Sequence, residues 1–273
     1  MDEAASPSLD RLVAAVAHSP KYRRVATDVV RRVGAQALDR DRRLKEAIKA
    51  TKNHLHRIGG AYLSGRPAYS AWIEQLSEAG PPATEAFKAK CRTILAQHAS
   101  TRERLPLLER FYTVLFAPSA PVRSIIDIGC GFNPLSAPWM PLAPGATYHA
   151  FDMYHDLAEF LNRFFRLVSL RGQAHACDVI RACPPHRVDA ALLLKCIPCF
   201  EQSEPGSGTL LLDRIDADYL FVSFPRQRLG GRRLDLGAPY RDSLAVFLQA
   251  RGWPFEQFEF DTETVWRICK RRA

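Results

Sequence analysis

Residues 125–134 read Ile-Ile-Asp-Ile-Gly-Cys-Gly-Phe-Asn-Pro, which predicts an apolar strand followed by a turn with two glycines. Open α/β sheets bind their ligands beyond the carboxyl ends of such strands. Gly129 and Gly131 let the backbone pass close to a ligand, because a Cβ there would occupy the space that the ligand needs. A dinucleotide-binding fingerprint requires a third glycine, where this chain has Pro134. The stretch therefore predicts a ligand-binding turn that is not built for a pyrophosphate.

Acidic residues accompany the first three predicted strands of this region. S-adenosylmethionine carries a sulfonium, an amino group and a carboxylate but no phosphate, so Asp127 beside the turn suits its amino group. Asp152 ends the next strand, where its two oxygens can accept both ribose hydroxyls. Asp178 ends the third strand, in a position to accept from the adenine amine. Any one of these acids alone is more often a solvated turn residue than a ligand contact; together they predict a site for S-adenosylmethionine.

The pattern around this turn predicts a Rossmann-like α/β fold with a mostly parallel seven-stranded sheet, as in class I methyltransferases. An amphipathic helix with apolar residues at helical spacing is expected over 157–168, ended by Gly172, and a second over 240–249. The last two strands, joined by a tight turn, predict an antiparallel edge. Strands are expected at 124–128, 147–151, 174–177, 190–194, 219–223, 255–260 and 264–269.

The first 117 residues show a helical pattern without β-branched alternation. One helical block covers about 9–58, and a second runs from 69 to 116 with a break at Pro81 and Pro82. We therefore expect a helical domain over 1–117 and a catalytic domain over 118–273.

The chain is strongly basic, with a formal net charge of +9, and residues 1–60 contribute +6 of it. An excess of this size favours a polyanionic partner such as nucleic acid, although many basic proteins bind none. Arginines of the helical region would contact RNA phosphates, which position a protein without reading sequence. The expected RNA contacts are Arg23, Arg24, Arg31, Arg32 and Arg57, with Arg228 and Arg232 in the catalytic domain.

The seven cysteines are scattered without a disulfide framework, and the chain has no apolar run of membrane-spanning length. The acidic residues 1–7 do not resemble a signal peptide. We therefore expect a cytoplasmic protein. Cys196 and Cys199 form a C-x-x-C pair, but further metal ligands are missing nearby, so no metal site is expected.

Several separated motifs resemble the aminoglycoside-resistance 16S rRNA methyltransferases, which methylate N7 of guanine 1405 in the ribosomal decoding site. The likeness covers nearly the whole chain. It is carried by the motifs His-Ala-Ser-Thr-Arg-Glu-Arg at 98–104, Asp-Ile-Gly-Cys-Gly-Phe-Asn-Pro-Leu at 127–135, Leu-Leu-Leu-Lys at 192–195, Ile-Pro-Cys-Phe-Glu at 197–201, Ser-Phe-Pro at 223–225 and Leu-Gly-Gly-Arg at 229–232.

This resemblance implies an S-adenosylmethionine-dependent methyltransferase acting on 16S rRNA in the 30S subunit. Arg104 would clamp the methionine carboxylate of the cofactor through two parallel hydrogen bonds. We expect a monomer, because docking on the ribosome needs the basic face free. The implied cofactor contacts are Tyr62, His98, Ala99, Ser100, Arg104, Asp127, Gly129, Asp152, Asp178, Val179, Leu194 and Glu204.

Methylation of guanine N7 needs no general base, because this nitrogen has an in-plane lone pair and no proton. Catalysis would then rest on alignment of nitrogen, methyl carbon and sulfur. Candidates for holding the base are Lys195, Pro198, Ser223, Phe224 and Arg226, although Lys195 and Phe224 could equally cap strand ends. A small-molecule or protein methyltransferase and a catalytically silent RNA-binding protein remain the alternatives.

Overall fold

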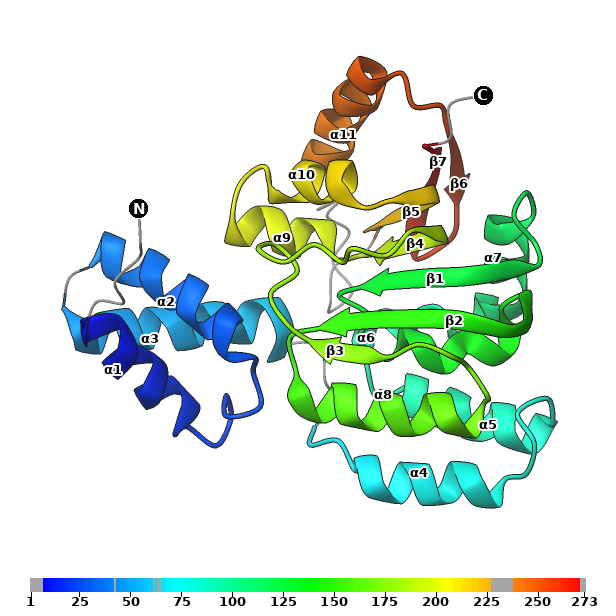
Figure 1. The fold of residues 1–273 in the computed structure, drawn as a ribbon, viewed down its shortest axis with the longest axis horizontal. Coiled ribbons are helices and arrows are strands. Elements are labelled where there is room, and N and C mark those ends of the chain that lie inside the picture. The colour runs from blue at the N-terminus through cyan, green and yellow to red at the C-terminus, as the bar shows by residue number, and fades with distance from the viewer. Residues whose placement is uncertain (1–6, 42, 61, 63–64, 227–237, 271–273) are drawn as a thin grey trace.

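The computed structural model describes residues 7–41, 43–60, 62, 65–226 and 238–270. Within this part of the chain, a twisted sheet flanked by helices on both faces forms the larger body, and a group of N-terminal helices lies beside one edge of it (Figure 1). Arg228 and Arg232, two of the expected RNA contacts, lie outside the described residues. None of the described helices has the length and apolar character needed to cross a bilayer.

The described strands form one seven-stranded sheet in the order β3-β2-β1-β4-β5-β7-β6. Its first five strands pair in parallel, and β7 is antiparallel to both β5 and β6. The mostly parallel sheet and its antiparallel edge are therefore confirmed. The strands are β1 (Val122–Ile128), β2 (Leu142–Asp152), β3 (Ala174–Ala176), β4 (Val188–Leu194), β5 (Ala217–Pro225), β6 (Phe255–Glu259) and β7 (Glu263–Cys269).

Alternate residues of the central strands feed two separate hydrophobic cores. On β1, Ile125 packs into the core that also holds α8 (His155–Leu167), while Ile126 faces the opposite core. Three further helices cover that second face: α9 (Ile197–Ser203), α10 (Ser207–Arg214) and α11 (Ala238–Arg251). The predicted helix after β2 is present as α8, whose apolar stripe is almost completely buried.

The helices before the sheet divide into two groups that pack differently. The first group surrounds its own core of Leu12, Val16, Val29 and Val33, whereas the second shares the core of the sheet. The packing thus divides the range 1–117 into two parts, where the sequence predicts one helical unit. The first group is α1 (Pro7–Ala17), α2 (Thr27–Arg40), α3 (Leu44–Leu55) and the π-helix η1 (His56–Gly60); the second is α4 (Tyr69–Glu78), α5 (Glu85–Leu95), α6 (Ala99–Arg102), the 3-10 helix η2 (Leu105–Leu107) and α7 (Leu108–Phe116).

Several short elements were not predicted from the sequence. The segment expected as one helix over 84–116 is interrupted after α5, and Pro106 lies within the short η2. The 3-10 helix η3 (Asn133–Trp139) follows the glycine turn and contains two prolines. Short helices contribute little periodicity, so the amphipathic pattern cannot identify them.

Gly172 allows the chain to enter β3 beside β2. Its φ is +104°, and a Cβ on this residue would lie 2.2 Å from the carbonyl oxygen of Tyr148. Gly80 has a similar φ of +86° but open space around it. Comparing substitutions at the two positions therefore separates the cost of a left-handed φ from the cost of steric overlap.

We predict that Gly172→Ala lowers the free energy of unfolding by about 3 kcal/mol or more, because a left-handed φ and overlap with backbone atoms add together. Gly80→Ala is the matched control and should cost only about 1 kcal/mol. Urea denaturation of both variants measures the difference. Equal losses would show that the close approach at Tyr148 has no energetic weight.

Candidate active site

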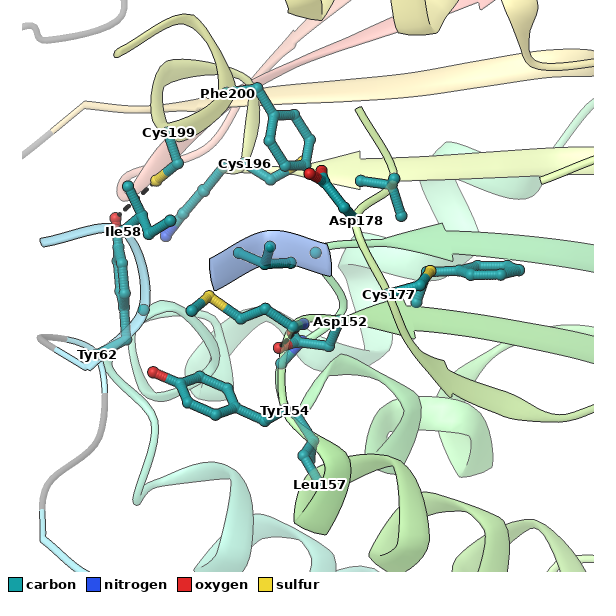
Figure 2. A pocket seen from close by; sticks show the side chains of 18 of the residues that line it. Ile58, Tyr62, Asp152, Tyr154, Leu157, Cys177, Asp178, Cys196, Cys199 and Phe200 are labelled. Atoms are coloured by element: carbon teal, nitrogen blue, oxygen red, sulfur yellow. Dashed lines mark hydrogen bonds between the residues drawn. The ribbon is translucent and has the colours of Figure 1, made fainter. Parts of the chain in front are cut away.

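A cavity opens at the carboxyl edge of the sheet, between the ends of the parallel strands and the N-terminal helices (Figure 2). Asp152, Asp178 and Tyr62 approach it from separate parts of the chain. Most of the expected cofactor residues are therefore brought together. Those that line the cavity are Tyr62, His98, Ser100, Gly129, Asp152, Asp178, Val179 and Leu194.

The glycine turn forms the floor of the cavity in the conformation that its sequence predicts. Gly129 and Gly131 have φ values of +60° and +49°, in the left-handed region that favours glycine. The backbone N–H of Gly131 donates to Oδ2 of Asp152 at 2.9 Å, which ties the turn to the end of β2. A Cβ on Gly131 would lie 3.0 Å from Nε2 of His98, so the turn also needs a small residue for packing.

Asp127 lies beneath the turn and does not line the cavity. Its Oδ2 accepts hydrogen bonds from Asn133 Nδ2 at 2.9 Å and from the Tyr148 hydroxyl at 2.7 Å. Burial raises the pKa of this carboxyl group to about 6. Asp127 is almost completely enclosed and supports the turn from below, so in this structure it does not face the cavity in which the amino group of the cofactor is expected.

Arg104 is also buried, with 1% of its surface exposed, and it does not line the cavity. Its Nε and Nη2 donate to the two carboxylate oxygens of Glu263, each at 2.9 Å, and its Nη1 donates to Asn133 Oδ1 at 2.9 Å. The bidentate clamp expected for the methionine carboxylate is therefore made to Glu263, at the first residue of β7. The sequence could not reveal this partner, which is 159 positions away.

Arg32 occupies a different place from the one expected. It was expected to contact RNA phosphates on an exposed face, but only 8% of its surface is exposed and it lines the cavity. Its guanidinium forms a buried ion pair with Asp178 and donates through Nη1 to the Ser203 hydroxyl at 2.8 Å. Its neighbour Arg31 points outward and pairs with Asp10 at 2.8 Å.

Of the residues expected near a target base, Lys195 is the one that lines the cavity. It follows β4 with a φ of +61°, and its Nζ lies 2.7 Å from Oε2 of Glu103 and 3.6 Å from Oε1 of Glu263. The Ser223 hydroxyl accepts from the backbone N–H of Lys195 at 3.0 Å and is fully buried. Ser223 therefore supports the lysine instead of facing the cavity.

Phe224, Pro198 and Arg226 do not reach the cavity. Phe224 is fully buried in the second core, where it packs against Trp266, so in this structure it does not face the cavity near which it is expected. Pro198 is buried in the first turn of α9. Arg226 is exposed and pairs with Glu259 at 3.0 Å. Side chains alternate along β5, so Phe224 faces the second core, as Val222 does, while Phe221 faces the first.

Two further expected contacts, Ala99 and Glu204, lie just outside the cavity. The backbone N–H of Ala99 donates to the carbonyl oxygen of Tyr62 at 2.9 Å, which places Tyr62 at the cavity wall. Glu204 pairs with Arg181 at 3.1 Å, next to the loop that carries Asp178.

Tyr62 and His98 form an aromatic wall at one end of the cavity. Their rings stack at 5.8 Å with an interplanar angle of 11°. The Tyr62 hydroxyl lies 3.2 Å from Sγ of Cys199, as the dashed line in Figure 2 marks. Burial, with the positive charges of Lys195 and Arg104 nearby, lowers the pKa of His98 to about 4. The imidazole is therefore neutral near pH 7.

Some residues of the cavity carried no recognisable signal in the sequence. Met153, Tyr154 and Leu157 follow Asp152 along the chain and line the cavity, and so do Cys196 and Phe200. Figure 2 shows Tyr154 and Leu157 below Asp152 and the other two residues above it. An apolar wall beside charged ends suits a ligand with a heterocyclic base. The seven cysteines are free, and the described residues include no cluster that could hold a metal ion.

The sequence matches the model of a protein family described as ribosomal RNA methyltransferase (FmrO) over residues 18–268. The chain belongs to this family. It is 35% identical to the 16S rRNA (guanine(1405)-N(7))-methyltransferase of Frankia casuarinae over 96% of this chain and 93% of that protein. A protein of the same name from Micromonospora echinospora is 32% identical over 96% of this chain and 97% of its own length.

Solved structures support the same membership. The 16S rRNA methyltransferase RmtF, determined in complex with S-adenosyl-L-homocysteine, superposes with a TM-score of 0.82 and 28% identity, covering 99% of this chain and 100% of that one. The 16S rRNA methylase RmtB superposes with a TM-score of 0.80 and 26% identity, covering 96% of this chain and 98% of that one. The FmrO-family fold with its helical N-terminal region is therefore shared.

The residues of this chain fit the S-adenosylmethionine that the family uses. The turn at Gly129 and Gly131 leaves room for the methionine part, and each oxygen of Asp152 has acceptor capacity beyond the backbone N–H that it binds. Val179 and Phe151 line the cavity with apolar surface that would suit the adenine ring, and Asp178 would offer an acceptor at its edge. Acceptors and apolar surface that suit the ribose and the adenine therefore line the same cavity as the glycine turn.

We predict that His98 makes the protein less stable as the pH falls. The folded-state pKa of about 4 lies below the ordinary 6.5, so its contribution is fully present above pH 6.5 and declines toward pH 4. Between these values His98→Gln should reduce the slope of unfolding free energy against pH by about 1.4 kcal/mol per pH unit, the value for one proton. Above pH 6.5 the parent and the variant should change in parallel. Denaturation at a series of pH values tests this; an unchanged slope between pH 4 and 6.5 contradicts it.

Proposed function

We propose that this protein transfers a methyl group from S-adenosylmethionine to N7 of guanine 1405 in 16S rRNA of the 30S subunit, which confers aminoglycoside resistance. The observation that carries the proposal is the near full-length similarity to proteins named for that reaction, together with a cavity whose residues fit the cofactor. Such a substrate implies that the protein acts in the cytoplasm. We also propose that it acts as a monomer, which leaves its basic face free.

The chemistry requires alignment of the base and control of charge. The cofactor supplies an electrophilic methyl group on a sulfonium. Guanine N7 attacks it with a lone pair and becomes cationic, so no residue has to remove a proton. Neutral His98 suits this reaction, because a cationic imidazole at the same place would oppose the developing positive charge.

Lys195 is the residue best placed to orient the base. The edge of guanine that carries N7 also presents the acceptor O6, which an ammonium can bind. The charge of Lys195 is opposed by Glu103 at 2.7 Å and by Glu263 at 3.6 Å. We infer that these carboxylates allow Lys195 to hold O6 without placing a net positive charge beside N7.

The N-terminal helices provide a basic surface for the ribosomal RNA. Arg23, Arg24 and Arg57 are exposed, and the Arg31 side chain is 42% exposed. Figure 1 shows that α1 to α3 lie at the same side of the sheet as its carboxyl edge. Phosphate contacts here would therefore bring the decoding site toward the cavity. Arg32 is excluded from this surface because it is buried.

The proposed reaction is tested by incubating the purified protein with labelled S-adenosylmethionine and 30S subunits, and by mapping the modified nucleotide. We expect one methyl group per subunit, at N7 of guanine 1405. Label at another nucleotide, or on naked RNA in preference to the subunit, would contradict the proposed target. Cofactor binding with no transfer to any ribosomal particle would favour a methyltransferase of another substrate, and RNA binding without cofactor binding would favour a silent RNA-binding protein.

We predict that Arg31→Glu weakens 30S binding and methylation about tenfold or more, because it reverses a charge on a surface that contacts phosphates. Binding of S-adenosylhomocysteine, measured by calorimetry, should stay as in the parent. Arg110→Glu is the control, since Arg110 is exposed on α7, outside the N-terminal helices, and does not line the cavity. If the parent and Arg31→Glu methylate the 30S subunit equally at both 50 and 200 mM salt, Arg31 is not part of the docking surface.

A further inference from the structure

Arg32 is held in the cavity wall by the packing of α2 against the sheet. The carboxylate of Asp28 on the same helix accepts from the backbone N–H of Asp178 at 2.8 Å. The N–H of Ala26 donates to the carbonyl oxygen of Met153 at 2.8 Å, just after β2. These contacts fix the start of α2 to the loops that end β2 and β3, so the guanidinium is delivered to one place.

The guanidinium of Arg32 has two partners, and each comes from a different element of the catalytic domain. Nε pairs with Oδ2 of Asp178, and Nη1 donates to Oγ of Ser203 on α9 at 2.8 Å. Ser203 is also 3.1 Å from Nε2 of His54 on α3. The side chain of Arg32 is 6% exposed, so its orientation is set by these contacts and not by solvent.

Asp178 needs such a partner because its side chain is only 2% exposed. An ionised carboxylate at that depth is costly unless a charge and hydrogen bonds compensate it. Its oxygens offer about four acceptor positions in all. Arg32 uses one, and the backbone N–H of Ile180 uses another at 3.2 Å, on the opposite oxygen. Acceptor positions thus remain on a carboxylate whose plane is fixed.

We propose that Arg32 is a positioning residue of the cofactor site: it holds Asp178 so that the free acceptor positions of this carboxylate meet the 6-amino group of the adenine. The α1–α3 group of helices is then a structural part of the cofactor site as well as a docking surface. This inference rests on the cofactor and on the adenine contact of Asp178, and it does not depend on which RNA is methylated.

The test is calorimetric binding of two ligands to the full chain without RNA: S-adenosylhomocysteine, and S-inosylhomocysteine, in which an oxygen replaces the 6-amino group. The parent should prefer the adenosyl ligand. Arg32→Gln should weaken that ligand about tenfold, the loss expected for a hydrogen bond to a charged group, and should reduce the preference between the two ligands. Arg40→Gln, at the exposed end of the same helix, is the matched control and should bind both like the parent.

A purely structural role for Arg32 predicts a different result. Arg32→Gln would then weaken both ligands by the same factor, and the preference would stay unchanged, which overturns the proposal. Unchanged binding of both ligands overturns it as well. If Arg32→Gln fails to fold, Arg32→Lys replaces it: the ammonium keeps the charge but not the geometry of Nε, so the preference should still fall.

A double-mutant comparison identifies Asp178 as the group through which Arg32 acts. Asp178→Asn should itself reduce the preference for the adenosyl ligand. Adding Arg32→Gln to Asp178→Asn should then cause no further reduction. Additive losses would show that Arg32 acts on the ligand by another route. These binding measurements contain no ribosomal particle. They can therefore contradict the role of Arg32 while methylation of 30S subunits is confirmed, or support that role while methylation is not found.

Discussion

The ion pair between Arg104 and Glu263 is the interaction on which the rest of the site depends. Both groups are almost completely buried, and the pair joins the segment after α6 to the start of β7. Arg104 also binds Asn133, which in turn donates to Asp127 beneath the glycine turn. Loss of one partner would leave a buried charge unpaired, at a cost of about 3–5 kcal/mol. Arg104 and Lys195 hold the pKa of Glu263 at about 2, so the pair persists over a wide range of pH.

The same pair supports the charge balance at the end of the cavity where a base would bind. Glu263 faces both Arg104 and Lys195, and Glu103 meets the outer side of Lys195. Two cations and two carboxylates therefore lie together, next to a neutral His98. For an attack that moves positive charge from a sulfonium to a guanine, a site without net charge avoids opposing the product. Burial of His98 lowers its pKa and so keeps the imidazole from taking up a proton and adding a positive charge to the site.

The sequence predicts the parts of the site that depend on local pattern. Two glycines after an apolar strand, and the acids at the ends of β2 and β3, lie where strand order and parallel pairing require. The sequence does not predict which residues far apart in the chain interact. A run of arginines does not reveal that Arg32 turns inward while Arg31 turns outward, because this depends on how α2 packs against the sheet. The sequence pairs Arg104 with a cofactor carboxylate, because a guanidinium can bind a carboxylate through two hydrogen bonds. It gives no sign of Glu263, the carboxylate that Arg104 binds in the structure, because the two residues are far apart in the chain.

The reversed direction of β7 has a consequence for how this protein tolerates insertions. Parallel strands present their last residues at the ligand edge, whereas β7 presents its first, and that residue is Glu263, paired in register with Pro225 of β5. Successive side chains of a strand alternate between faces, so one residue inserted within β7 directly after Glu263, with the rest of β7 kept in register, would transfer the carboxylate to the wrong side of the sheet. The register of a strand near the edge of the sheet is thus constrained by the electrostatics of the catalytic centre.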